Sequence, residues 1–320
     1  SRTHCLDEES LIMPDVTVLG LFCADLITRT PRMPVWGETL EGCGFSLMAG
    51  GKGSNQAVAA ARQGADVSLI SRLGDDAFAP LAHDLYAEAG VDATHVDIDD
   101  IASTGTATIL VDDARGDNAI VIDPGACARL SPAAIDAAAP AITTARIFVC
   151  QLELPLSLCE YAIALAERHA VPVILNPAPA RTLPRRLFTR IDYLTPNESE
   201  AAALVGHPVE TDAQIDQAAA TLRDWGVRHV LITLGERGVH IDSDAFRGRL
   251  PAIAVERVVD TIGAGDAFNG ALAAALADGE EIVAAARRAC VTAGLSVTRA
   301  GAAAALPDRQ TVDARLSATR

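Results

Sequence analysis

Residues 259–270 read Val259-Asp260-Thr261-Ile262-Gly263-Ala264-Gly265-Asp266-Ala267-Phe268-Asn269-Gly270. A short turn with two glycines opens directly into a stretch rich in alanine and leucine, which favours a helix. Gly263 and Gly265 carry no Cβ, so the backbone can lie close to an anion there. The first N–H groups of a helix lack partners within the helix and bind phosphate readily. The stretch therefore predicts a phosphate-binding helix N-terminus.

Asp266 falls in the first turn of this predicted helix. The helix dipole favours the ionised form of a carboxylate at that end. Donors for a phosphate beside a fixed base are what transfer of a phosphoryl group to a hydroxyl requires. For an isolated G-x-G-D, the alternative is an ordinary helix N-terminal carboxylate. The rest of the chain decides between the two.

A second glycine-rich stretch reads Gly50-Gly51-Lys52-Gly53-Ser54-Asn55-Gln56. It lacks the G-x-x-x-x-G-K-[ST] spacing, so it is not a Walker A motif. Lys52 is the only lysine of the chain. Codon usage in a GC-rich genome explains a general shortage of lysine, but not why the one that remains lies between two glycines.

With these two stretches the chain resembles the ribokinase-like (PfkB) carbohydrate kinases, and within them the ribokinase and deoxyribokinase branch. The resemblance covers about residues 16 to 306. Four shorter motifs lie between the two stretches in the family's order: Gln151-Leu152-Glu153, Asn176-Pro177-Ala178-Pro179-Ala180, Thr195-Pro196-Asn197-Glu198-Ser199-Glu200 and Ile232-Thr233-Leu234-Gly235-Glu236-Arg237-Gly238. The resemblance implies an ATP-dependent sugar kinase that phosphorylates the 5-hydroxymethyl group of D-ribose, with 2-deoxyribose or another small sugar as the alternative.

Hydrophobic periodicity alternates along the chain between short apolar runs and helical patterns. The runs predict strands at 16–20, 67–71, 147–150, 173–175, 191–194 and 230–233. The helical patterns cover 55–63, 78–89, 155–169, 198–205, 212–225, 265–277 and 281–297, and Gly64, Gly90, Gly206 and Gly226 fall where helices end. The alternation predicts an α/β fold with a doubly wound, Rossmann-like sheet and helices on both faces.

Two stretches without helical pattern, at 26–48 and 106–122, interrupt this alternation. By resemblance they form a small β-sheet lid over the sugar, with strands from about 21–48 and 98–123. The alternative is a pair of surface hairpins, but a sheet that no helix covers needs another surface to bury it. The resemblance implies that the lid of a second subunit provides this surface, so we expect a homodimer through the lids. The remaining chain, 16–320, is expected to be a single kinase domain, and residues 1–15 a loose extension.

The resemblance assigns roles to individual residues. Asp266 is the expected base, and Ile262 with Gly263, Ala264 and Gly265 is expected to supply backbone N–H groups to the phosphoryl oxygens. The expected sugar-binding residues are Asp25, Gly51, Lys52, Asn55, Glu153 and Asp266. For Asn55 the alternative is a helix N-cap. The expected ATP-binding residues are Asn197, Thr233, Leu234, Gly235, Glu236, Arg237, Gly238 and Gly265.

Two ion sites follow from the same resemblance. Asn197 and Glu200 form an N-x-x-E pair that would hold Mg²⁺ through water, and the alternative is a capping box. The residues expected around a monovalent cation, K⁺ as activator, are Asp260, Ile262, Ser296, Arg299, Gly301 and Ala305. Family members often carry serine at the position of Ala305, and ribokinases carry asparagine at the position of Cys23.

Composition limits the other classes of function. The net charge of −16 argues against nucleic acid or an anionic membrane as partner. Seven cysteines without a C-x-x-C pair suggest neither zinc nor disulfides and fit a cytoplasmic protein. A nicotinamide oxidoreductase is disfavoured because Gly20-Leu21-Phe22-Cys23 lacks G-x-G-x-x-G. A non-catalytic sugar-binding regulator remains the distant alternative.

Overall fold

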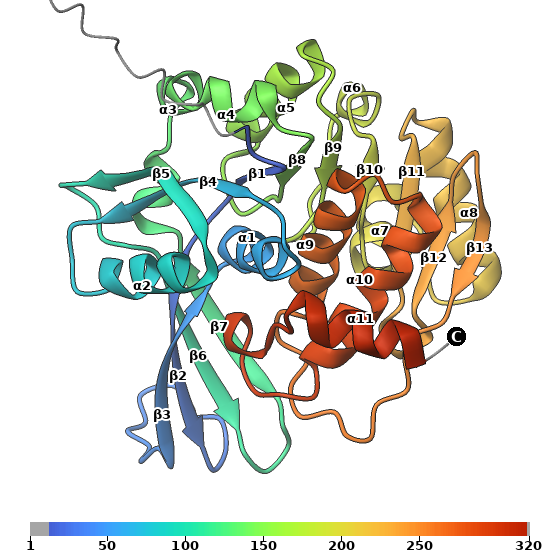
Figure 1. The fold of residues 1–320 in the computed structure, drawn as a ribbon. Helices are drawn as coiled ribbons and strands as arrows, with labels where there is room; N and C mark the ends of the chain where they lie inside the picture. Colours follow the sequence, from blue (N-terminus) through green and yellow to red (C-terminus); the bar gives the residue numbers. More distant parts are fainter. Residues whose placement is uncertain (1–12, 319–320) are drawn as a thin grey trace, which may run out of the picture.

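The computed structural model describes residues 13–318, so most of the predicted extension, 1–12, lies outside the described residues. Within this range the chain forms a nine-stranded and a four-stranded sheet (Figure 1). The larger sheet consists of β1 (Val16–Leu19), β4 (Val67–Gly74), β5 (Val91–Asp99), β8 (Ile147–Cys150), β9 (Val173–Leu175), β10 (Tyr193–Leu194), β11 (His229–Thr233), β12 (Val239–Asp242) and β13 (Arg247–Leu250). Their order across the sheet is β13-β12-β11-β10-β9-β8-β1-β4-β5.

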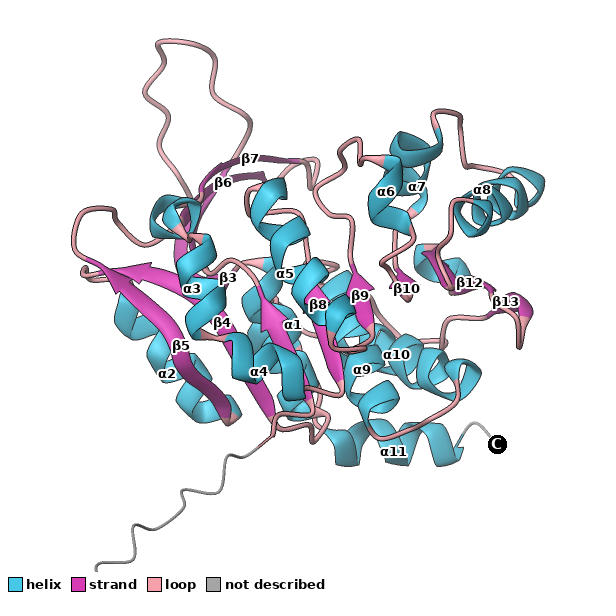
Figure 2. Ribbon diagram, turned by 90° about the horizontal axis from the view of Figure 1, so that it is seen from above, coloured by secondary structure: helices cyan, strands magenta, loops and turns pink. Residues whose placement is uncertain are grey.

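The strands from β5 to β11 are parallel, and β12 and β13 join as antiparallel strands at the edge. Figure 2 shows β5, β4, β8 and β9 in this order across the sheet, with β1 between β4 and β8. From β1 the chain builds outward to β4 and β5, and it then returns to β8 on the opposite side of β1. Because strand order reverses between β1 and β8, a crevice is expected at the carboxyl ends of these two strands.

Helices cover both faces of the large sheet, as predicted. One layer contains α1 (Lys52–Arg62), α2 (Ala79–Ala89), α9 (Ala264–Ala277) and α10 (Ile282–Ser296). The other contains α3 (Pro132–Ala137), α4 (Ala139–Thr144), α5 (Leu156–Arg168), α6 (Arg185–Phe188), α7 (Glu198–Val205) and α8 (Asp212–Asp224). None of the helices within residues 13–318 is long and apolar enough to cross a membrane.

The alternation of side chains along β1 explains the two layers. Val16 and Val18 pack into the core cluster beneath α1, α2, α9 and α10, whereas Leu19 belongs to the cluster beneath α3–α8. Thr17 points to the second face too, where its hydroxyl donates a 2.7 Å hydrogen bond to the Ala141 carbonyl. A strand buried on both faces is typical of a parallel sheet. The predicted fold class is therefore confirmed.

Some elements differ from the predicted ones. Strands β5, β12 and β13 and helices α3, α4, α6 and α11 (Arg309–Ala318) were not predicted. β5 and β13 are the edge strands of the sheet, and polar residues interrupt both of them, so they show no continuous apolar run. Helix α1 begins at Lys52 instead of residue 55. Gly53 lies in this helix, and it is a glycine because a Cβ there would lie 2.4 Å from Cα of Gly20, directly after β1.

The four-stranded sheet is the predicted lid. It consists of β3 (Gly44–Gly50), β2 (Cys23–Thr30), β6 (Thr106–Asp112) and β7 (Asn118–Asp123), in this order. Asp25 and the half-buried Ile27 share the inner face with the buried Ala107 and Ile109, opposite them on β6. Figure 1 shows the four strands extending beyond the edge of the large sheet.

The lid also has an outer, exposed face. Phe45, Leu47 and Val121 share it because they pair with Thr28, Leu26 and Thr108 on neighbouring strands. Phe45 is 67% exposed and Val121 72% exposed. The outer face of the lid therefore presents large apolar side chains to solvent.

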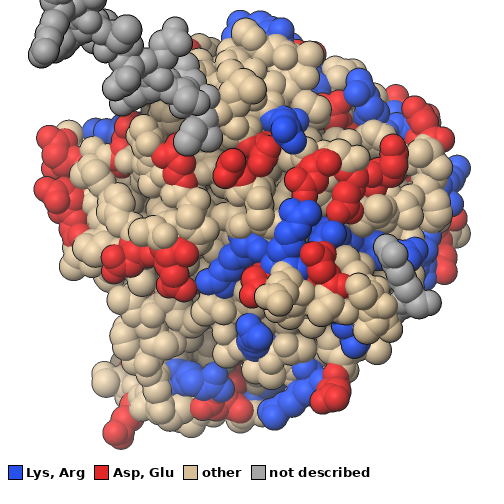
Figure 3. All heavy atoms as spheres, viewed as in Figure 1, with Lys and Arg blue, Asp and Glu red and all other residues tan. Residues whose placement is uncertain are grey.

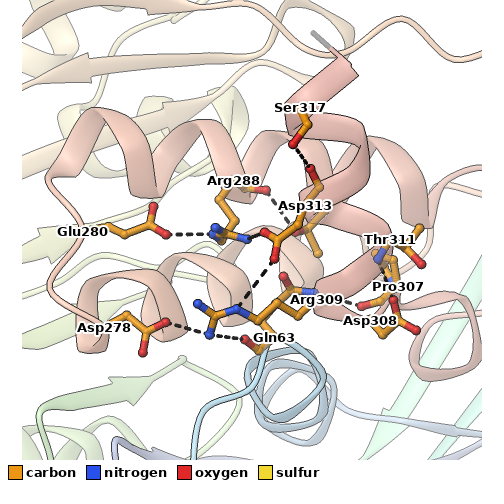
Figure 4. Close-up of polar contacts among 11 residues, drawn as sticks. Gln63, Asp278, Glu280, Arg288, Pro307, Asp308, Arg309, Thr311, Asp313 and Ser317 are labelled. Carbon is orange, nitrogen blue, oxygen red and sulfur yellow. Dashed lines mark hydrogen bonds and ion pairs between the residues drawn. The ribbon is translucent and has the colours of Figure 1, made fainter. Parts of the chain in front are cut away.

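Helix α11 (Arg309–Ala318) is held in place by polar contacts (Figure 4). Arg288 of α10 contacts Glu280 at 3.0 Å and Asp313 of α11 at 2.5 Å. Arg309 contacts Asp278 at 2.8 Å, and the side-chain amide of Gln63 donates a 2.9 Å hydrogen bond to the Pro307 carbonyl. In Figure 3 basic side chains gather over α10 and α11 with acidic side chains around them. These contacts join the C-terminal helix to α1, α9 and α10.

Candidate active site

A cavity of about 220 Å³ lies where α1 and α9 begin, near the carboxyl ends of the central strands. It is lined by Lys52, Asn176, Ala178, Thr195, Asn197, Glu200, Thr233, Thr261, Gly263, Gly265, Asp266 and Asn269. The structure thus brings together residues from five of the six motifs found in the sequence. Sequence reasoning missed Asn176, Ala178, Thr195, Thr261 and Asn269 as lining residues, although each lies inside or beside a recognised motif.

The N-terminus of α9 faces this cavity. Gly263 is its N-cap with φ 75°, a left-handed conformation that favours glycine. A Cβ at Gly263 would also lie 2.9 Å from Cβ of Ala302. Two of the four predicted N–H donors are engaged elsewhere, because Ile262 N–H donates to Oδ1 of Asp260 at 2.9 Å and Ala264 N–H to the Thr261 carbonyl at 3.2 Å. Gly263 and Gly265 remain as candidate anion donors.

Asp266 is the third residue of α9 and is 6% exposed. Asn55 donates a 3.0 Å hydrogen bond to its Oδ2, and Gln56 donates one of 3.0 Å to its Oδ1. Burial raises the pKa of Asp266 above its ordinary value, while the charge of Lys52 and the two amide hydrogen bonds act in the opposite direction. A buried carboxylate whose two oxygens are both oriented can serve as a base towards a hydroxyl.

Asn55 lies within the first turn of α1 but is not its N-cap, so the capping alternative is wrong. Gly51 is the N-cap, with φ 91°, and a Cβ there would lie 2.4 Å from the Leu21 carbonyl oxygen. The Oδ1 atom of Asn55 is buried and has no hydrogen-bond partner within residues 13–318. Asn55 can therefore accept a hydrogen bond from a ligand while its Nδ2 holds Asp266.

Lys52 and Glu153 lie side by side, since the backbone N–H of Lys52 donates a 2.9 Å hydrogen bond to Oε2 of Glu153. Burial lowers the pKa of Lys52, but the negative charges of Asp266, Glu153 and Glu200 outweigh it and raise the pKa. Burial raises the pKa of Glu153 to about 7, although the charge of Lys52 opposes this shift. The sole lysine is thus a cation surrounded by three carboxyl groups.

Asp25 lies on β2, opposite Met48 of β3. A Cβ at Gly50 would lie 2.3 Å from Oδ2 of Asp25, so this glycine makes room for the carboxylate. The Cys23 thiol donates a 3.2 Å hydrogen bond to Oδ1 of Asp25. Burial raises the pKa of Asp25, and the Cys23 hydrogen bond opposes it. Burial and the neighbouring Asp25 raise the pKa of Cys23 far above the ordinary thiol value.

Asn197 and Glu200 form a reciprocal capping box at the start of α7. The backbone N–H of Glu200 donates to Oδ1 of Asn197 at 2.8 Å, and the backbone N–H of Asn197 donates to Oε2 of Glu200 at 2.9 Å. Burial raises the pKa of Glu200, and the Asn197 hydrogen bond opposes this. The capping alternative is therefore correct, and both side chains line the cavity as well.

The predicted ATP turn follows β11. Thr233 lines the cavity, whereas the side chain of Leu234 is buried in the core. Residues Gly235–Arg237 form a single 3₁₀ turn η2, which includes Glu236, and Gly235 and Gly238 have φ of 56° and 92°. Arg237 pairs with Glu198 and lies 3.5 Å from Asp212, so it is an ion-paired residue.

The predicted cation residues lie in two segments that Asp260 connects. Its Oδ1 accepts the Ile262 N–H at 2.9 Å, and its Oδ2 accepts the Gly301 N–H at 2.9 Å. The hydroxyl of Ser296 donates to the Ala293 carbonyl at 2.8 Å, and the N–H of Arg299 donates to the Ser296 carbonyl at 3.2 Å. Ala305 lies in the 3₁₀ turn η3 (Ala303–Ala305) and is buried. Asp260 thus fixes the loop before α9 against the loop after α10.

Residues 13–309 match the pfkB family of carbohydrate kinases, and the chain belongs to this family. It is 38% identical over 295 residues to a ribokinase of Haemophilus influenzae, with 92% of this chain and 96% of the relative covered. It is also 38% identical over 304 residues to a deoxyribokinase of Salmonella typhi, with 95% and 99% covered.

A solved structure of Arabidopsis thaliana ribokinase complexed with ribose and ATP resembles this chain with a TM-score of 0.88 and 32% identity. The match covers 95% of this chain and 99% of that chain. The predicted family and the predicted class of enzyme, a phosphotransferase that acts on a sugar hydroxyl, are confirmed.

Proposed function

We propose that this protein transfers the γ-phosphate of ATP to the 5-hydroxymethyl group of D-ribose, which gives D-ribose 5-phosphate. The observation that carries the proposal is Asp266, which is buried at the N-terminus of α9 with Asn55 and Gln56 on its two oxygens. Ribokinase relatives at 37–38% identity from bacteria and yeast support ribose as the acceptor.

In this proposal Asp266 orients the sugar hydroxyl and accepts its proton as the bond to the phosphorus forms. A raised pKa makes Asp266 a stronger base than an exposed aspartate. The N–H groups of Gly263 and Gly265 receive charge that develops on the phosphoryl oxygens. Lys52, which lines the same cavity, adds a positive charge there.

The sugar is proposed to bind between the lid and the large sheet. Asp25, Gly51, Asn55 and Glu153 would hold its hydroxyls, and Lys52 lies between the sugar and phosphate positions. The free Oδ1 of Asn55 supports this, because a buried acceptor without a partner favours a ligand that donates to it.

ATP is proposed to bind along Thr233, the η2 turn and Asn197. Within residues 13–318 there is no cluster of three or more His, Cys, Asp or Glu side chains that could hold a metal ion. The oxygens of Asn197 and Glu200 at the cavity fit Mg²⁺, which keeps several of its waters and is held by few carboxylates together with phosphates. Bound Mg²⁺ would neutralise phosphate charge.

A monovalent cation, K⁺, is proposed beside Asp260. The carboxylate bridges two backbone segments, and a cation there would act by shaping the loop that leads to Gly263. The outer lid face with Phe45, Leu47 and Val121 is proposed to pair with the lid of a second copy, because such large apolar side chains favour burial.

A second candidate substrate is 2-deoxyribose. Cys23 donates only a weak thiol hydrogen bond to Asp25, and a thiol serves a sugar hydroxyl poorly. The deoxyribokinase relative at 38% identity supports this candidate as well.

The experiment is an ADP-release assay with Mg²⁺ and K⁺ over a panel of pentoses, 2-deoxyribose, hexoses and nucleosides. We expect the highest kcat/KM with ribose or 2-deoxyribose, and NMR of the product should place the phosphate on C5. Sugar-dependent ADP release that is absent for the whole panel, although sugar and ATP bind, would instead favour the non-catalytic regulator.

A further inference from the structure

Behind Asp266 lies a buried chain of side-chain amides. Gln56 of α1 is fully buried, and its Nε2 donates hydrogen bonds of 3.0 Å to Oδ1 of Asp266 and 3.1 Å to Oδ1 of Asn176. Its Oε1 accepts a 2.7 Å hydrogen bond from Nε2 of Gln151. Both N–H groups of the Gln56 amide and one of the two lone pairs on its oxygen are therefore engaged in hydrogen bonds.

A backbone carbonyl fixes the direction of this chain. Nδ2 of Asn176 donates a 3.1 Å hydrogen bond to the Thr195 carbonyl, which can only accept. Asn176 must therefore turn its Oδ1 towards Gln56, and Gln56 must present its N–H groups to both Asn176 and Asp266. In the reversed orientation, Oε1 of Gln56 would face the carboxylate of Asp266, and two acceptors would repel each other.

Gln151 completes the arrangement from the other side. It follows β8 directly, and its Oε1 lies 2.6 Å from the position that a Cβ on Gly20 would occupy. The missing side chain of Gly20 at the end of β1 thus provides the space for Gln151. Gln56 and Gln151 are buried, both N–H groups of Gln56 are engaged by Asn176 and Asp266, and Nε2 of Gln151 is engaged by Gln56, so neither amide group is placed to donate to a substrate.

We propose that Gln56 is a positioning residue for the phosphoryl transfer, which holds Oδ1 of Asp266 so that the carboxylate meets the sugar hydroxyl at a fixed angle, and that Gln151 acts through Gln56. The proposal rests on the proposed role of Asp266 as the base. Asn55 cannot replace Gln56 because it holds the other oxygen, Oδ2. A base free to rotate about its Cβ–Cγ bond loses the alignment on which proximity depends.

The amide also affects the charge of the base. Its hydrogen bond favours the ionised form of Asp266 against the burial that disfavours it. The charged groups around Asp266 are Lys52 of α1, Glu153 after β8, Asp25 of β2 and Glu200 of α7. All of these charged groups remain when Gln56 is replaced. A shift in the acidic limb of the kcat profile, which is the fall of kcat at low pH, would therefore result from loss of the Gln56 hydrogen bond.

The test replaces Gln56 by methionine, which has a similar volume and no N–H group. We expect Gln56→Met to lower kcat by about 10- to 100-fold, with KM for sugar and ATP almost unchanged. The acidic limb of the kcat profile should move up by about one pH unit, because one charge-assisted hydrogen bond is lost.

The matched control is Gln63→Met at the other end of α1. Gln63, the C-cap of α1, is also buried, and its side chain donates one hydrogen bond to the Pro307 carbonyl (Figure 4). We expect unchanged kcat and pH profile, and a smaller loss of thermal stability because one hydrogen bond is lost and not three. A Gln56→Met enzyme whose kcat and pH profile are unchanged, as expected for this control, would overturn the proposal.

A second variant, Gln151→Met, keeps the proposal testable if Gln56→Met does not fold. It should lower kcat and shift the acidic limb in the same direction. When Gln151→Met is added to Gln56→Met, kcat should fall little further, because the effect of Gln151 passes through Gln56. Fully additive effects of the two substitutions on kcat, or an unshifted acidic limb in Gln151→Met, would contradict the proposal that Gln151 acts through Gln56.

The Asp266→Asn variant separates failure of this proposal from failure of the proposed function. If Asp266→Asn keeps normal turnover, the base assignment is wrong. If Asp266→Asn is inactive and Gln56→Met has normal turnover, only the positioning role is wrong.

Discussion

The side-chain amide of Asn55 donates a 3.0 Å hydrogen bond to Oδ2 of Asp266, although 211 residues separate the two in the chain. Helix packing makes this contact possible. Gly270 of α9 lies against α1, where a Cβ on it would be 2.4 Å from Cβ of Ala59 and 2.5 Å from the Gln56 carbonyl oxygen. The close approach of the two helices therefore brings the two glycine-rich motifs of the sequence to a single carboxylate.

The first prediction concerns the base. Asp266→Asn keeps the shape of the side chain and removes its basicity, and it leaves one of the two amide donors facing an NH₂ group. We expect turnover to fall by roughly 10²–10⁴-fold, while ATP still binds. Turnover is measured by ADP release and ATP binding by calorimetry.

Asp278→Asn at the opposite end of α9 is the matched control for this variant. Asp278 pairs with Arg309 and has no contact with the cavity, so its replacement should leave turnover unchanged (Figure 4). Near-normal turnover of Asp266→Asn would show that another group accepts the proton.

The second prediction concerns pH. Burial raises the pKa of Glu153 from 4.5 to about 7, so its carboxyl is largely protonated at pH 6 and ionised at pH 8. Since sugar hydroxyls donate better to an ionised carboxylate, kcat/KM for the sugar should fall as the pH falls through about 7. In Glu153→Gln this limb should disappear, with a lower kcat/KM throughout.

The same shift has a consequence for folding stability. A carboxyl whose pKa is higher in the folded than in the unfolded state contributes stability below pH 4.5 that is lost as the pH rises through about 7. Glu153→Gln should therefore reduce the decline in stability over this range in thermal melts. A kinetic limb near pH 7 that persists in Glu153→Gln would mean that a different group controls it.

Much of the fold could be predicted from the sequence because its central strands are buried on both faces. β8, for example, reads Ile-Phe-Val-Cys without a polar residue, and Thr17 is the one polar residue of β1. β5 could not be recognised in this way, because it pairs on one side only and reads Val-Asp-Ala-Thr-His-Val-Asp-Ile-Asp. The start of α1 was misplaced because Gly53 resembles a loop residue, whereas its role is close packing against Gly20.

The site could be predicted as a set of residues but not as an arrangement. The motifs place Asp266 and Asn55 correctly at the start of helices, whereas Lys52 was expected in a loop and is the first residue of α1. They do not show that the N–H groups of Ile262 and Ala264 are engaged, since this depends on the path of the loop around Asp260. The amide chain through Gln56 depends on contacts across 95 to 210 residues, which periodicity cannot reveal.

The third prediction concerns assembly. Light scattering at micromolar concentration should give twice the chain mass, because Phe45, Leu47 and Val121 on the outer lid face favour burial. Val121→Lys should produce monomers. Ile101→Lys, at an equally exposed isoleucine outside the lid strands, should leave the mass unchanged. A monomeric wild-type protein would mean that the lid is not a dimer interface.

The fourth prediction concerns the monovalent cation. Activity in Na⁺ buffer without other large monovalent ions should rise when K⁺ is added, because Asp260 shapes the loop before Gly263. Ala305 offers no side-chain oxygen, so Ala305→Ser should lower the K⁺ concentration needed. Ala304→Ser adds a hydroxyl at the neighbouring exposed position and should have no effect. Equal rates with and without K⁺ would exclude the site.

The last prediction concerns the choice of sugar. Cys23 is buried beside Asp25, and its thiol donates to Oδ1 of that carboxylate at 3.2 Å. Asparagine, which the resemblance to ribokinases leads us to expect at this position, both donates and accepts, whereas a thiol is a weak donor. Loss of one good hydrogen bond to a buried sugar hydroxyl costs on the order of 1–3 kcal/mol. We therefore expect the wild-type preference for ribose over 2-deoxyribose, measured as kcat/KM, to be weak or reversed.

Cys23→Asn should move this preference towards ribose, because the amide can serve the 2-hydroxyl that deoxyribose lacks. The matched control is Cys43→Asn. Cys43 also donates to an aspartate, Asp113, at 3.1 Å, but at the exposed edge of the lid. It should leave the ratio of the two kcat/KM values unchanged. A strong wild-type preference for ribose that Cys23→Asn does not alter would show that Cys23 does not read the 2-hydroxyl.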